Sequence, residues 1–135
     1  MQQAATFAIR TECPPGACDC GREQLEQPGS DIRILMLTRD EEKRLIARIT
    51  AVDSYDDLKK VQAQMQAKLG MVLTIAPGPN EVKTVRGLQI ELADQPGLCR
   101  KTRQAVPAAV RKCLEQNLEI AYAILDAHDL FGANP

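Results

Sequence analysis

The chain has 135 residues, a length that suits one domain with a continuous apolar core. Its hydrophobic fraction of 44% and charged fraction of 26% are ordinary globular values, which exclude a disordered chain and a coiled coil. A net charge of −1 provides no overall attraction to nucleic acid or anionic membranes, and 3% aromatic residues leave little material for stacking on bases or sugars.

No stretch of the sequence approaches the roughly 20 apolar residues that a helix needs to cross a bilayer. The first ten residues, MQQAATFAIR, also lack a long apolar run. We therefore expect a soluble, cytoplasmic protein. In that reducing compartment, an odd number of cysteines, five in all, favours metal ligands or free thiols over structural disulfides.

The first predicted elements are two strands, at residues 6–10 and 31–37. The second strand is apolar on both of its alternating faces, which indicates an inner strand that is covered on each side. Thr38 followed by Glu41 matches a capping box, and apolar residues then recur at helical spacing, so a helix is predicted over about 39–51.

A second helix is predicted to begin at Asp53 or Ser54 and to end at Gly70, so that the two helices form a hairpin. Strands are predicted at 71–75 and 87–93, because β-branched residues or a clean alternation of apolar and polar residues occur there.

Two prolines and a glycine predict a turn at 76–80 between these strands. Thr102 is a predicted cap for the next helix, whose first turn accommodates Pro107, and residues 120–125 belong to a last helix. The order ββααββαα predicts a single α+β domain over residues 1–135, with a roughly four-stranded antiparallel or mixed sheet and about four helices packed on it.

A cysteine-rich loop is predicted at residues 11–30, and three thiols fall within eight residues of it: Cys13, Cys18 and Cys20. Thiolates are soft donors that select zinc or iron–sulfur clusters, and the prolines and glycines of the loop let several sulfurs face one centre. A loop this long is unusual in a compact domain, and a bound metal would order it. The sequence therefore predicts a metal site, with structural zinc preferred.

The spacing C-x4-C-x-C resembles a zinc knuckle in its closing Cys20-Gly21, without the C-x2-C pair of that family. It also resembles the plant-type ferredoxin loop C-x4-C-x2-C, with one residue fewer in the last interval. A structural zinc needs a fourth ligand, and we expect Cys99, because the turn at 95–98 leaves its side chain free. The alternatives are Cys113, which fits an apolar helix stripe better, His128, Asp19 and Glu12.

Residues 97–114 contain no acid and five basic residues, namely Arg100, Lys101, Arg103, Arg111 and Lys112. Such a basic segment can neutralise the phosphates of nucleic acid or bind an acidic partner, whereas the alternative is a solvated helix face. His128 is the only histidine and thus the only general base expected near pH 7, but its place at the end of the last helix favours a structural role.

The favoured interpretation is a small accessory or regulatory protein whose cysteine loop binds structural zinc and whose body contacts another protein. The first alternative is a redox or electron-transfer protein, in which the same cysteines hold an iron–sulfur cluster or act as redox-active thiols. The second alternative is a nucleic-acid-binding protein that uses residues 100–112. An enzyme is less favoured, because no P-loop, G-x-S-x-G or H-E-x-x-H pattern is present.

Overall fold

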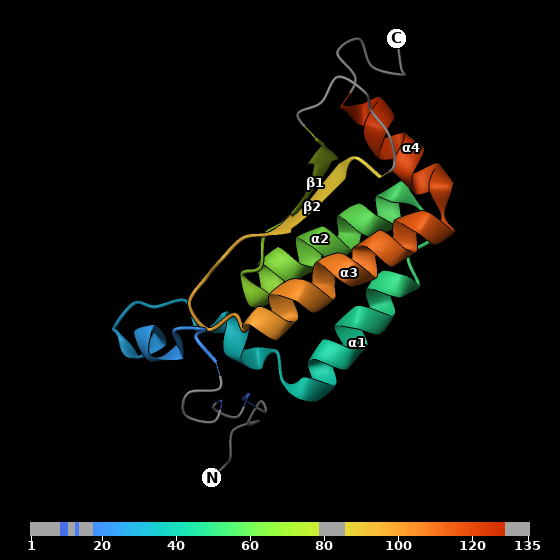
Figure 1. Ribbon diagram of the computed structural model, residues 1–135. Coiled ribbons are helices and arrows are strands. Elements are labelled where there is room, and N and C mark those ends of the chain that lie inside the picture. The colour runs from blue at the N-terminus through green and yellow to red at the C-terminus, as the bar shows by residue number, and fades with distance from the viewer. Residues whose placement is uncertain (1–8, 11–12, 14–17, 79–85, 129–135) are drawn as a thin grey trace.

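The computed structural model describes residues 9–10, 13, 18–78 and 86–128. Within this part of the chain the fold is a small, mostly helical α+β arrangement of four α-helices and a two-stranded antiparallel sheet. The helices are α1 (Arg39–Thr50), α2 (Tyr55–Leu69), α3 (Arg100–Gln116) and α4 (Leu118–Ala127). Helix α1 packs against α2 and α3, while α4 lies at the end of α3 that is remote from the N-terminal segment (Figure 1).

The starts of α1 and α2 are fixed by side-chain caps, as predicted. The hydroxyl of Thr38 accepts a hydrogen bond from the amide of Glu41, and that of Ser54 accepts one from the amide of Asp57. Each cap satisfies an amide that the helix itself leaves without a partner. Gly70 ends α2 with a left-handed φ of 71°, which only glycine adopts without strain.

The predicted hairpin of α1 and α2 is confirmed. The guanidinium of Arg48 on α1 makes two hydrogen bonds to the carboxylate of Asp57 on α2, one of them 2.9 Å long. A paired guanidinium and carboxylate in this fork geometry fix both distance and orientation. The short connection at 51–54 and this ion pair together hold the two helices at one end.

The predicted strand at residues 31–37 is wrong, because Arg33–Met36 forms a 3-10 helix, η2. Ile34 and Leu37 are buried while Ile32 is 56% exposed, so burial follows a spacing of three and not the alternation of a strand. The guanidinium of Arg33 donates to carbonyl oxygens in the last turn of α2, which gives this segment a place against a helix end instead of in a sheet.

The four-stranded sheet predicted from the sequence is also wrong for the described residues, which form two strands. Residues 6–8 of the first predicted strand lie outside the described residues, and residues 9–10 are not in a strand. The amide of Arg10 nevertheless donates to the carbonyl of Leu35 at 2.8 Å, so the two segments do meet through one backbone bond.

The second pair of predicted strands is confirmed with shifted bounds. Strand β1 (Leu73–Pro77) pairs antiparallel with β2 (Leu88–Leu92), and Leu73 lies opposite Leu92. The turn predicted at 76–80 begins too early, since Ala76 and Pro77 belong to β1 and residues 79–80 lie outside the described residues. Proline has no amide hydrogen to donate to the partner strand, and at the end of a strand this loss is tolerated.

Helix α3 starts three residues earlier than a cap at Thr102 predicts. The residue at the N-cap position is Cys99, and Thr102 is buried, with its hydroxyl donating to a carboxylate oxygen of Glu42 on α1. Pro107 therefore lies in the interior of the helix and not in its first turn. In the interior, the missing amide hydrogen of proline removes one helical hydrogen bond. Helix α3 keeps its continuity because its buried face is anchored along its length.

The core is aliphatic and lies between the three long helices α1, α2 and α3, the two-stranded sheet and α4. Its largest wholly buried side chains include Ile34, Ile49, Leu58, Met65, Leu88, Leu98, Leu114 and Ile124. Cys113 belongs to this core with 1% exposure, as its place on an apolar stripe predicts. Among the described residues, no helix is both long enough and apolar enough to cross a membrane.

Candidate metal centre

The site lies where α3 begins, and a glycine turn determines that position. Gly97 has a φ of +86°, and a Cβ there would meet Leu25 at 2.7 Å and Ile34 at 2.8 Å. Only glycine satisfies both the backbone conformation and the close approach. The amide of Gly97 also donates to the carbonyl of Cys20 at 2.8 Å, so the turn before α3 is fastened directly to the N-terminal segment.

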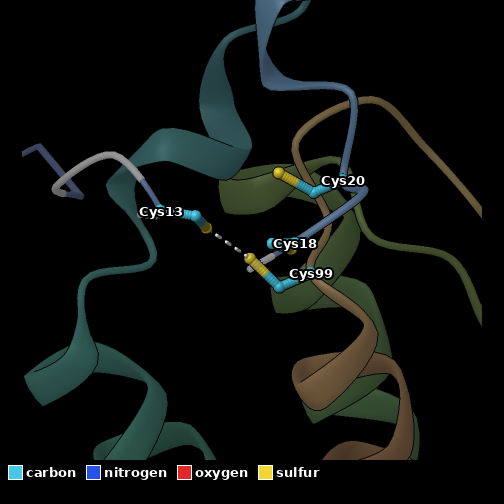
Figure 2. Close-up of side chains that lie close together, drawn as sticks. All are labelled: Cys13, Cys18, Cys20 and Cys99. Carbon is cyan, nitrogen blue, oxygen red and sulfur yellow. Dashed lines mark hydrogen bonds between the residues drawn. The ribbon is translucent and has the colours of Figure 1, made fainter. Parts of the chain in front are cut away.

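Cys99 occupies the N-cap position of α3 without using its side chain as a cap. Its sulfur instead faces the N-terminal segment, where it lies 3.5 Å from the sulfur of Cys13 (Figure 2). The amino-terminal end of a helix favours negative charge, because the peptide dipoles add there. The dipole of this helix of 17 residues therefore acts in favour of a thiolate at Cys99, in opposition to the burial of that side chain.

Four thiols meet at this point. The sulfur atoms of Cys13, Cys18, Cys20 and Cys99, hereafter the cysteine cluster, all lie within 4.8 Å of one another. Figure 2 shows Cys99 at the start of α3 and the other three on the N-terminal segment beside it. The structure thus brings together the three cysteines of the loop and the residue that the sequence favoured as their fourth partner.

Three thiols of the cysteine cluster, those of Cys13, Cys18 and Cys99, have perturbed pKa values. Burial, followed by hydrogen bonding with Cys13 and Cys18, raises the pKa of Cys99 strongly. Burial is also the main cause of the raised pKa of Cys13. Burial opposes ionisation of Cys18 as well, but hydrogen bonds from the Cys99 thiol and the Cys20 amide outweigh it and lower the pKa to about 7. Four adjacent sulfurs cannot all ionise without a cation, because each thiolate repels the next.

Charged side chains surround the cysteine cluster. Asp19, between two of the cysteines, forms an ion pair with Arg100 on α3 at 3.0 Å. Arg103, one turn further along α3, is paired with Asp94 and lies 4.0 Å from Asp19. The guanidinium of Arg10 donates to the sulfur of Cys20 at 3.9 Å. The loop is thus attached to α3 by ion pairs in addition to the sulfurs.

The structure does not gather the predicted basic segment into one free cationic surface. Arg100 and Arg103 are engaged with acids, and Arg111 donates to the carbonyl of Leu88 at 2.6 Å. Lys101 and Lys112 are exposed on α3. Paired arginines offer less charge to phosphates than the sequence count suggests, and nucleic-acid binding stays a prediction.

The other residues considered as the fourth ligand lie elsewhere or have other partners. Cys113 is buried in the core, where its thiol donates to the carbonyl of Val52 at 3.5 Å. A ring nitrogen of His128 lies 2.9 Å from the carbonyl of Ile124 at the end of α4, which fits the structural role predicted for it. Asp19 is in its ion pair, and Glu12 lies outside the described residues.

Sequence reasoning missed the contact of Arg10 with a sulfur of the cysteine cluster and the close packing at Gly97. Arg10 stands in a segment predicted as a strand, and nothing in its spacing from the cysteines marks it as a neighbour of sulfur. Gly97 was part of a recognised turn, but its close contact with Leu25 is a tertiary feature. Local sequence patterns do not report contacts of this kind.

Comparison with known proteins does not assign a role to the cysteine cluster. Comparison of the chain with models of protein families, with curated proteins and with solved structures finds no match. What the cluster does must be argued from the chemistry of its four sulfurs and of the residues around them. That chemistry is compatible with a bound metal ion.

Proposed function

We propose that this chain is a small accessory or regulatory protein whose cysteine cluster binds one structural zinc ion, leaving its helical body to contact a protein partner. The observation that carries the proposal is the convergence of four sulfurs within 4.8 Å from two distant parts of the chain. Three of these sulfurs come from residues 13–20, and the fourth comes from the start of α3.

The sulfur separations favour a single ion. A zinc–sulfur bond of about 2.3 Å places the sulfurs of a tetrahedral site about 3.8 Å apart. The distance of 3.5 Å between Cys13 and Cys99 and the limit of 4.8 Å for all pairs bracket that value. An iron–sulfur cluster interposes several iron and sulfide atoms between its thiolates and holds them farther apart. A cluster would require the loop to move away from α3.

The donor set favours a structural role for the ion. Four thiolates complete the coordination of zinc, whereas catalytic zinc sites keep one position for water or substrate. The ligands also join the N-terminal segment to the start of α3, a junction supported by few buried apolar residues, such as Leu25 and Leu98. A closed site at such a junction supplies stability that the small apolar contact cannot supply.

A protein partner is proposed because the body presents apolar side chains away from the metal centre. Leu118 and Tyr122, one turn apart on α4, are 47% and 53% exposed. Exposed tyrosine beside an aliphatic residue is typical of surfaces that bind proteins. Helix α4 lies at the end of α3 opposite to the cysteine cluster (Figure 1), so such contact would leave the metal site undisturbed.

The deciding experiment is elemental analysis and visible spectroscopy of anaerobically purified protein. We expect about one zinc per chain, no visible absorption, and a melting temperature that falls in chelator. Cys99→Ser should abolish stoichiometric zinc, while Cys113→Ser is the matched control because Cys113 is a core thiol outside the cluster. Iron with sulfide and visible absorption would instead establish the electron-transfer alternative, and protein without metal would reduce the cluster to free thiols.

A further inference from the structure

The guanidinium of Arg10 contacts a sulfur of the cysteine cluster. We propose that Arg10 is a positioning residue of the metal centre, whose guanidinium donates to the Cys20 sulfur and compensates the negative charge of the metal-bound thiolates. The inference rests on the zinc site proposed above and identifies the residue outside the ligand set that controls its affinity. It starts from the 3.9 Å contact between the Arg10 guanidinium and the Cys20 sulfur.

Arg10 is held in place by its backbone. Its amide donates to the carbonyl of Leu35, in η2, at 2.8 Å, so its Cα is fixed relative to the buried segment around Ile34. The side chain is half-buried, and its Nε atom is buried without a hydrogen-bond partner among the described residues. Leaving a guanidinium N–H without a partner is costly, and a nearby anion would offset that cost.

The metal centre needs a cation at this position. Four thiolates around one divalent ion carry two net negative charges, which are partly shielded from water by the surrounding chain. The neighbouring arginines on α3 do not meet this need in full, because Arg100 is paired with Asp19 and Arg103 is paired with Asp94. Arg10 has no acidic partner among the described residues, so its charge is available to the sulfurs.

Arg10 acts on the ligand set from outside it, through its contact with the Cys20 sulfur. Hydrogen-bonding partners of metal ligands typically change metal affinity by about 10-fold to 100-fold.

The test is a zinc titration of the full chain in competition with a chromophoric chelator. Arg10→Met keeps the length of the side chain and removes its charge, and Arg10→Lys keeps the charge. The control, Lys112→Met, removes a positive charge from α3 at about 20 Å from Cys99, a separation at which salt screens the interaction between charges. We expect Arg10→Met to bind zinc about 10-fold or more weakly, at unchanged stoichiometry, with most of the affinity restored in Arg10→Lys and no change in Lys112→Met.

The melting temperature of the metal-free variants separates a charge effect from a folding effect. Equal melting of the metal-free wild type and Arg10→Met, together with weaker zinc binding, supports the proposal. Zinc affinity in Arg10→Met within twofold of the wild type overturns it, as does Arg10→Lys binding no better than Arg10→Met. Should Arg10→Met fail to fold, Arg10→Gln is judged by the same criteria. If the wild-type protein binds no zinc, the proposed function itself is overturned. The Arg10 variants test only the role of Arg10, so the two failures are distinguishable.

Discussion

The two ends of α3 are held by different forces. Its carboxyl-terminal half buries Val110 and Leu114 to 0% and 1% exposure in the aliphatic core. Its amino-terminal end meets the rest of the chain through Cys99 and through the ion pairs of Arg100 and Arg103. Apolar burial tolerates many sequences, because any side chain of suitable size stabilises it, whereas the other end requires particular atoms at particular places. The difference separates a body that folds by packing from a junction where sulfurs and charged groups meet.

The strongest way to break the packed end is Leu114→Ala. Removing a buried leucine leaves a cavity, so we expect a loss of about 3 kcal/mol in the free energy of unfolding. The matched control is Leu118→Ala, the same substitution at a residue that is 47% exposed, for which we expect less than about 0.5 kcal/mol. Denaturant unfolding measures both. Equal losses would show that α3 is not held by its apolar face.

The corresponding change at the other end is Gly97→Ala. The new Cβ would press on Leu25 at 2.7 Å in a left-handed backbone, so we expect a loss of about 2 kcal/mol together with weaker zinc binding. Gly29→Ala shares the positive φ, 82°, but has nothing within 4 Å of the added carbon. It should lose less stability and keep its zinc affinity, and a similar loss of affinity in both variants would argue against a special role for the turn before Cys99.

A smaller change sharpens the comparison inside the body. Ser54→Ala removes the hydroxyl that accepts the Asp57 amide at the start of α2, and we expect a loss of about 1 kcal/mol. Zinc affinity should not change, because α2 supplies no ligand of the cysteine cluster. Ser54→Asp keeps an acceptor at the cap and should retain most of the stability. Weakened zinc binding in Ser54→Ala would show that body and junction are coupled.

The smallest expected effect lies at the ion pair of Asp31 and Arg33, beside the end of α2. Hydrogen bonding from Arg33 lowers the pKa of Asp31 to about 2. A carboxylate with a lowered pKa stabilises the fold above its ordinary pKa, and that contribution disappears as the pH falls through the lowered value. Asp31→Asn should therefore melt slightly below the wild type at pH 5, and the two curves should converge near pH 2. A difference that persists at pH 2 would have another cause.

Local patterns predicted the local structure well. The caps at Thr38 and Ser54 and the stop at Gly70 depend on residues within one turn of each other, so the sequence contains all the information needed. The strand predicted at 31–37 is wrong because the apolar run of this segment fits two structures equally well. It fits a buried strand, and it fits a 3-10 helix that buries Ile34 and Leu37. Tertiary contact decided between the two.

The four cysteines that meet at the site were predictable from the sequence, and the groups around them were not. Three of the cysteines stand close together in the sequence, and the turn before Cys99 marked it as accessible, whereas Thr102 looked the better helix cap. Cysteine is a weak cap, so the residue that starts α3 carried no helical signal of its own. The contact of Arg10 with sulfur depends on how residues 10 and 35 meet, which no spacing rule describes.

The separation of the cysteines along the chain has a consequence for the order of folding. Cys13 and Cys99 are 86 residues apart, and α1, α2 and both strands lie between Cys20 and Cys99. Closing a flexible loop of that length costs at least about 4 kcal/mol in chain entropy, so the fourth sulfur seldom meets the other three in an unfolded chain. For the zinc site proposed above, Cys13, Cys18 and Cys20 would therefore meet the ion first, as an incomplete site. Closure by Cys99 would wait for the helices and for the pairing of β1 with β2, so that full coordination would mark a chain that has finished folding.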